Sequence, residues 1–104
     1  LSDQDDIWDQ EKLICAINKI KEALKDKSVN DDFEQIYIGL RHLKIQVQFA
    51  TFAYPFIMSF IIDSLDVLDR MITSYHKDRK CTMPELCDFC DHINNVIAMS
   101  LKII

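Results

Sequence analysis

A run of apolar residues between positions 33 and 50 repeats with the spacing of an amphipathic helix. Successive members of the run are three, four, three, four and three residues apart. This spacing places them on one side of a helix, where they form a continuous seam for contact with other helices. The members of the seam are Phe33, Ile36, Leu40, Leu43, Val47 and Ala50. Such a seam predicts that the chain folds by packing helices against one another.

Three further segments show the same periodicity, at about residues 5–25, 55–76 and 83–104. The chain has one glycine and two prolines in 104 residues, which is too few for a turn-rich β-sandwich. Its length is sufficient for one hydrophobic core. The sequence therefore predicts an all-α fold, a four-helix bundle of antiparallel helices of roughly 20 residues each.

The boundaries of the domain and of two helices are signalled locally. The chain begins at Leu1 and ends at Ile104 inside an apolar run, so we expect residues 1–104 to be a single helical domain excised from a longer chain. Pro55 lacks an amide hydrogen and disfavours helix at the residue before it, so the third helix is predicted to begin there. Thr82 and Glu85 have the spacing of a capping box, which predicts the start of the fourth helix.

The second helical segment carries an additional apolar stripe, about 180° from its seam. The stripe consists of Ile38, Ile45, Phe49 and Phe52. A helix with two apolar faces must be covered on both sides. We expect this helix to lie centrally in the bundle; the alternative is that a second molecule covers the additional stripe.

Charge and composition argue against two classes of function. Residues 45–62 are 18 uncharged residues in a row, but two Gln, a Thr, a Ser and Pro55 interrupt them, so we expect no membrane span. The formal net charge is −5, with 17 acidic and 12 basic residues, and the basic residues are scattered. This distribution lacks the clustered Lys and Arg of a nucleic-acid surface, so we expect no nucleic-acid partner.

The segment 81–92, CTMPELCDFCDH, holds three of the four cysteines. Cys81, Cys87 and Cys90, with His76 from across the preceding loop, have the residue types of a Cys3His zinc site, although the spacing is irregular. Cys90 falls at the edge of the core stripe, where a reduced cysteine is a good small apolar filler. An even cysteine count also permits two disulfides, with Cys15 as the distant partner. We expect reduced structural thiols and no metal or cofactor.

No arrangement of residues predicts an enzyme. The di-iron bundle pattern needs Glu three residues before His on two helices, and no His here has that neighbour. Asp88 and His92 lie four residues apart on the outer face of the fourth helix, where a solvated surface pair is the usual outcome.

His42 lies in the segment 39–45, GLRHLKI. An exposed His with Lys44 close by, in an acidic four-helix chain of this length, resembles histidine phosphotransfer domains. The resemblance rests on these two residues, and Ile45 stands where such domains tend to have a small residue. We therefore assign no family from it.

The function expected from the sequence is that of a non-enzymatic, intracellular interaction domain. It would bind a helix of another protein, or a second copy of itself, through an apolar helix face with an acidic rim. The candidate contact residues lie on the additional stripe and on the outer side of the fourth helix: Ile38, Ile45, Phe49, Met99 and Ile103. The alternative is a secreted, disulfide-stabilised four-helix protein, either a cytokine-like ligand or a carrier of apolar molecules.

Overall fold

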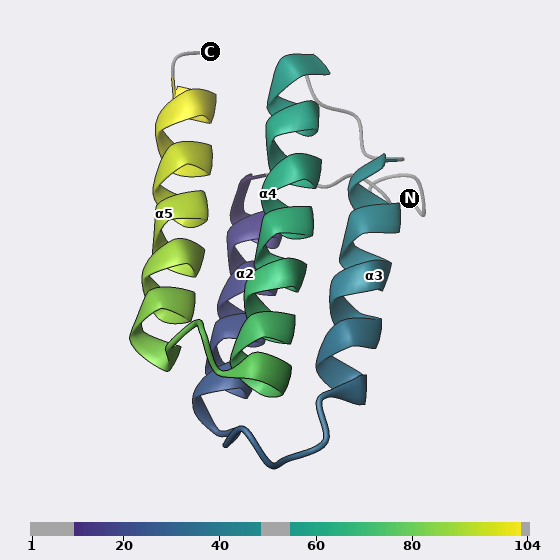
Figure 1. The fold of residues 1–104 in the computed structure, drawn as a ribbon. Helices are drawn as coiled ribbons and strands as arrows, with labels where there is room; N and C mark the ends of the chain where they lie inside the picture. The colour runs from purple at the N-terminus through teal and green to yellow at the C-terminus, as the bar shows by residue number, and fades with distance from the viewer. Residues whose placement is uncertain (1–9, 49–54, 103–104) are drawn as a thin grey trace.

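The computed structural model describes residues 10–48 and 55–102, which form four α-helices and a short π-helix. The elements are α2 (Gln10–Lys25), α3 (Glu34–Gln48), α4 (Pro55–Thr73), η1 (Ser74–Asp78) and α5 (Met83–Lys102). None of the described residues is in a strand. The predicted all-α four-helix bundle is confirmed (Figure 1), and α4 begins at Pro55 as its missing amide hydrogen predicted.

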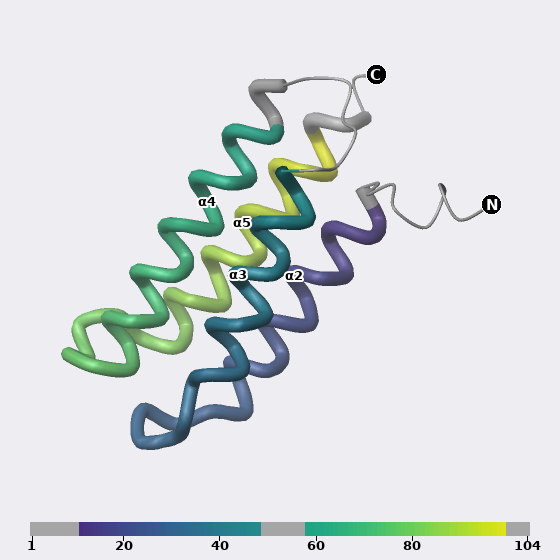
Figure 2. Tube along the Cα trace, turned by 90° about the vertical axis from the view of Figure 1, so that its right-hand side faces the viewer, coloured from purple at the N-terminus to yellow at the C-terminus, as the bar shows by residue number. Residues whose placement is uncertain are grey.

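The helices form a ring in which the chain direction alternates from one helix to the next (Figures 1 and 2). Helix α2 packs against α3 and α5, and α4 packs against the same two helices from the other side. Helices α3 and α5 therefore lie diagonally opposite each other. In such a ring every helix has one face toward the core and one face outward.

The core is built from the stripes predicted on the four helices. The fully buried members of these stripes are at most 6% exposed, and burial of each large aliphatic side chain contributes roughly 1.5–3 kcal/mol to stability. The buried members are Leu13, Ile17, Leu24, Phe33, Ile36, Leu40, Leu43, Val47, Ile61, Leu65, Leu68, Ile72, Leu86, Ile93 and Ile97. Ile20, Tyr75 and Phe89 are partly buried against this core. The helical periodicity thus identified the interior face of every helix.

The expected central position of the second helix is wrong. Helix α3 buries Leu40, Leu43 and Val47 on one face, while Ile45 on the other face is 47% exposed. The additional stripe is therefore not enclosed by another helix within the described part of the chain. The periodicity revealed two apolar faces, but which face is covered depends on how many helices pack around α3.

The start of α5 has the capping box that the sequence predicted. The backbone amide of Thr82 donates to Oε1 of Glu85 at 3.0 Å, and the amide of Glu85 donates to Oγ1 of Thr82 at 3.3 Å. The hydroxyl of Thr82 also donates to Oε1 of Glu85, at 2.9 Å. These bonds satisfy amides at the helix start that have no partner within the helix.

The end of the third helix differs from its expected form. The helical segment predicted over residues 55–76 ends as an α-helix at Thr73 and continues as the π-helix η1 to Asp78, in which Oγ of Ser74 donates to Oδ1 of Asp78 at 2.8 Å. The amide of Lys80 donates to the carbonyl oxygen of Ser74 at 3.2 Å and to Oδ1 of Asp78 at 3.1 Å. Arg79 then turns the chain in the left-handed region, at φ 58°. Residues 76 and 77 therefore lie in a π-helical turn and not at the end of an α-helix.

Candidate interaction surface

The outer face of α3 presents the additional apolar stripe to solvent. Ile45 is 47% exposed and Ile38, seven residues earlier, is partly exposed. Seven residues are nearly two helical turns, so these side chains stand in line, roughly 10 Å apart along the axis. Arg41 and His42 lie between them and are exposed. The surface is therefore an apolar stripe with a basic residue, Arg41, near its centre.

The neighbouring charges leave Arg41 available for a partner. The ammonium of Lys44 forms an ion pair with the carboxylate of Asp66 on α4, so that cation is already neutralised. Arg41 forms no ion pair with any residue that the structure describes. The positive charge at the centre of the stripe is thus carried by the exposed residue Arg41.

The three predicted contact residues that the structure describes, Ile38, Ile45 and Met99, do not form one surface. Met99 is 69% exposed on α5, diagonally across the bundle from α3. A single helix lying on Ile38 and Ile45 cannot reach it, because two helices of the ring lie between. Phe49 and Ile103 lie outside the described residues.

The structure does not assemble the zinc candidates. His76 lies in η1 with its ring against Phe33, on the side of the bundle next to α3. No three His, Cys, Asp or Glu side chains among the described residues are grouped so that they could hold a metal ion. Cys81, Cys87 and Cys90 lie just before and within the first turns of α5, whereas His76 lies in η1.

All four cysteines are free. Cys90 and Cys81 are buried, Cys87 is half-buried and Cys15 is exposed. Burial raises the pKa of the Cys90 thiol to about 12, assisted by the nearby Cys87 and Asp91. Burial likewise raises the pKa of Cys81. Two of the four thiols thus serve as neutral apolar side chains.

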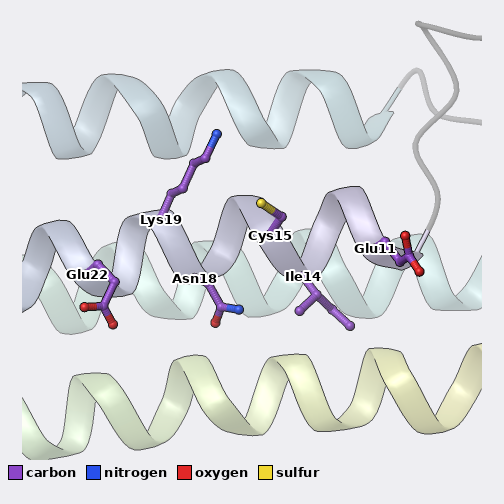
Figure 3. A pocket seen from close by; sticks show the side chains of 6 residues that line it. All are labelled: Glu11, Ile14, Cys15, Asn18, Lys19 and Glu22. Carbon is purple, nitrogen blue, oxygen red and sulfur yellow. The ribbon is translucent and has the colours of Figure 1, made fainter.

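A hollow of about 520 Å³ lies on the outer face of α2 (Figure 3). Cys15 and Lys19 point toward α3, whereas Ile14 and Asn18 point toward α5. Asn18 accepts a hydrogen bond of 2.8 Å from the side-chain amide of Asn94 on α5. The described residues that line the hollow all belong to α2, so they supply one wall and cannot enclose a ligand.

A second cavity, of about 460 Å³, lies between the first turns of α3 and η1. It has walls from both elements, which gives a ligand two sides to contact. Its lining consists of Asp32, Phe33, Glu34, Tyr37, Ile38, Arg41, His76 and Lys77. Sequence reasoning missed this cavity, because it lies between α3 and a π-helix that the sequence did not predict. The closest local signal is the Ser74–Asp78 pair, which is equally compatible with an ordinary α-helix.

No protein-family model matches this sequence, and comparisons with curated proteins and with solved structures found no match. None of the described helices is long and apolar enough to cross a membrane. The α3 side of the bundle carries both the additional apolar stripe and the cavity between α3 and η1. The stripe and the cavity share Ile38 and Arg41.

Proposed function

We propose that this chain is a non-enzymatic interaction domain that binds an amphipathic helix of another protein along the outer face of α3. The observation that supports the proposal is the 47% exposure of Ile45, in line with Ile38, on a helix whose other face is closed by the core. Large apolar side chains exposed in helical register are typical of surfaces that receive a partner helix. Binding would remove both isoleucines from water.

The charge at the centre of the stripe indicates the chemistry of the partner. Arg41 has no ion pair among the described residues and lies between the two isoleucines. A partner helix that buries apolar residues seven positions apart would place its intervening side chains near this guanidinium. Asp or Glu at those positions would form charge-assisted hydrogen bonds, and Lys or Arg would be repelled. The proposed partner is therefore an amphipathic helix with acidic residues between two apolar ones.

The same charge argues against a symmetric dimer through α3. If two copies paired antiparallel, Ile38 of one copy would contact Ile45 of the other. The two Arg41 side chains would then meet near the twofold axis. Because like charges in an interface oppose association, we propose a different protein as the partner.

We further propose that the domain works inside the cell. The four free thiols support this location, since cysteines of secreted proteins are usually paired. A secreted form with two disulfides would require oxidation of the thiols that are buried at positions 81 and 90.

A selection from a displayed library of helical peptides tests the proposed function. The wild-type protein is the bait, and the Arg41→Glu variant is a parallel bait. Peptides selected by the wild type should share two apolar residues seven positions apart with Asp or Glu between them. The Arg41→Glu variant should select Lys or Arg at the intervening positions.

Selected peptides whose sequences do not change between the two baits would contradict the proposed surface. Sedimentation of the wild-type protein alone tests the symmetric alternative. We expect a monomer; a dimer that Ile45→Glu dissociates would show that the partner is a second copy.

A further inference from the structure

The cavity between α3 and η1 is bordered by a cluster of aromatic rings. The rings of Phe33 and His76 are stacked, with centroids 4.4 Å apart and planes 20° apart. Tyr37 and Tyr75 lie next to Phe33, with ring centroids 6.5 Å and 6.0 Å from it. Phe33, Tyr37 and His76 all contribute to the lining of the cavity. An aromatic guest entering the cavity would meet ring faces and edges, which are favourable partners for another ring.

The tyrosine hydroxyls of this cluster are already used within the protein. Oγ1 of Thr73 donates to the carbonyl oxygen of Asp69 at 3.0 Å, so the hydroxyl of Tyr37 is the donor in its 3.2 Å bond to that Oγ1. The hydroxyl of Tyr75 donates to the carbonyl oxygen of Lys27 at 3.4 Å. These bonds fix the two rings and leave neither hydroxyl hydrogen for a ligand.

His76 is different, because its Nδ1 is buried and has no hydrogen-bond partner. A neutral imidazole has one nitrogen that donates and one that accepts. Buried polar atoms are nearly always hydrogen-bonded, and an unpaired one destabilises the protein. In the tautomer that carries its hydrogen on Nε2, Nδ1 is the acceptor, and a ligand that supplies a donor to Nδ1 would remove this penalty. Because Nδ1 is shielded before binding, the ring must turn as the ligand enters, which is a common side-chain response at interfaces.

The two basic residues of the lining favour the same kind of ligand, and the lining also holds the carboxylates of Asp32 and Glu34. Arg41 and Lys77 form no ion pair within the part of the chain that the structure describes. Cations of this kind are attracted to the face of an electron-rich ring. Asp32 is already engaged, since its Oδ1 accepts a hydrogen bond of 2.9 Å from the amide of Glu34. A volume of about 460 Å³ falls within the range of ligand-binding cavities, roughly 300–1,000 Å³.

We infer that this cavity is the anchor pocket of the domain and receives an aromatic side chain with a ring hydrogen-bond donor, that of tryptophan, from the partner helix. The inference rests on the proposed function, since the cavity is continuous with the α3 stripe through Ile38 and Arg41. The indole ring lies against the aromatic cluster, and its N–H donates to Nδ1 of His76. Buried tryptophan side chains of this kind commonly dominate the affinity of an interface.

The test uses two small molecules of the same shape, so that it does not depend on any partner. Indole carries the N–H donor, and benzofuran has a ring oxygen in its place. Each is titrated into the isotope-labelled full chain while backbone amide resonances are followed by NMR. Indole should shift the amides of Phe33, Tyr37, Ile38 and His76, and it should bind roughly fivefold tighter than benzofuran.

The His76→Phe variant is the matched control, because it retains a ring to stack on Phe33 but lacks Nδ1. It should bind indole and benzofuran equally. If the variant loses its helical signal, the test rests on the ratio of the indole and benzofuran affinities of the wild-type protein. Equal affinities in the wild type, or shifts confined to other residues, would overturn the inference.

This outcome is distinguishable from failure of the proposed function. Indole binding in the cavity, combined with peptide binding that ignores Arg41 and Ile45, would retain the pocket and refute the α3 surface. Peptide binding that depends on Ile45, combined with no preference for indole, would support the α3 surface and refute the pocket.

Discussion

The imidazole of His76 lies face to face with the ring of Phe33, at a centroid distance of 4.4 Å. This contact joins η1 to the residue that immediately precedes α3, so two segments far apart in sequence form one corner of the bundle. Phe33 is 1% exposed and also contacts Tyr37 and Tyr75. The corner therefore depends on Phe33 both for core packing and for the position of His76.

Replacing Phe33 with Ala should destabilise the protein by about 3–5 kcal/mol, because the substitution leaves a cavity in a packed core. Urea denaturation followed by circular dichroism measures the change. His42→Ala is the control, because His42 is an exposed residue of α3. Its replacement should change stability by no more than about 0.5 kcal/mol. Equal stability of the two variants would show that Phe33 is not part of the core.

Gly39 should be replaceable by Ala with a gain in stability. It lies within α3, and a Cβ added there meets no atom within 4 Å apart from its chain neighbours and the backbone of its own helix; it also borders a cavity of about 230 Å³ between α2 and α3. Alanine loses less conformational entropy than glycine on forming a helix, so Gly39→Ala should add about 0.5–1 kcal/mol. A lower unfolding midpoint in urea would contradict this placement of Gly39.

Thr82→Ala should reduce stability by about 1 kcal/mol through loss of the α5 cap, whereas Thr82→Ser should retain most of it. The hydrogen bond from the side chain of Thr82 lowers the pKa of Glu85 from its ordinary value of 4.5, and the bond from the backbone amide of Thr82 adds a smaller effect in the same direction. A carboxylate with a lowered pKa stabilises the fold above its unfolded pKa, and that contribution disappears as pH falls through the folded value. The difference in stability between wild type and Thr82→Ala should therefore shrink below about pH 4.5. A difference that is constant with pH would contradict the capping box.

The thiols should differ in reactivity according to their burial. Iodoacetamide at pH 8 should alkylate the exposed Cys15 first, and Cys90 last, since its pKa is raised to about 12. Intact mass and peptide mapping over time give the order. Four alkyl groups after unfolding without reductant would agree with free thiols. A missing pair would identify a disulfide and support the secreted alternative.

Local signals were sufficient to predict the helices and their interior faces. The seam from Phe33 to Val47, the helix start at Pro55 and the cap formed by Thr82 and Glu85 all depend on residues within one helix. Such patterns can be read from the sequence because they follow from the helical repeat and from backbone hydrogen bonding.

The candidate site could be predicted only in part. Ile38 and Ile45 were identified from their spacing, but whether they face solvent depends on the ring arrangement of the helices. The ring arrangement also places Met99, on α5, away from these two residues. The contact of His76 with Phe33 depends on the π-helix at Ser74–Asp78, for which no residue in that segment is specific.

The affinity of one selected helical peptide for three proteins tests the central claim most directly. The proteins are the wild type, Ile45→Glu on α3 and Met99→Glu on α5, which receive the same charge at exposed positions on opposite sides of the bundle. Fluorescence anisotropy gives the affinities, and circular dichroism checks that the helical signal is unchanged. We predict that Ile45→Glu weakens binding by about 30-fold or more, as for a central interface residue, and that Met99→Glu leaves it unchanged. A folded Ile45→Glu variant that binds as tightly as the wild type would contradict the account, and loss of binding in Met99→Glu alone would move the interface to α5.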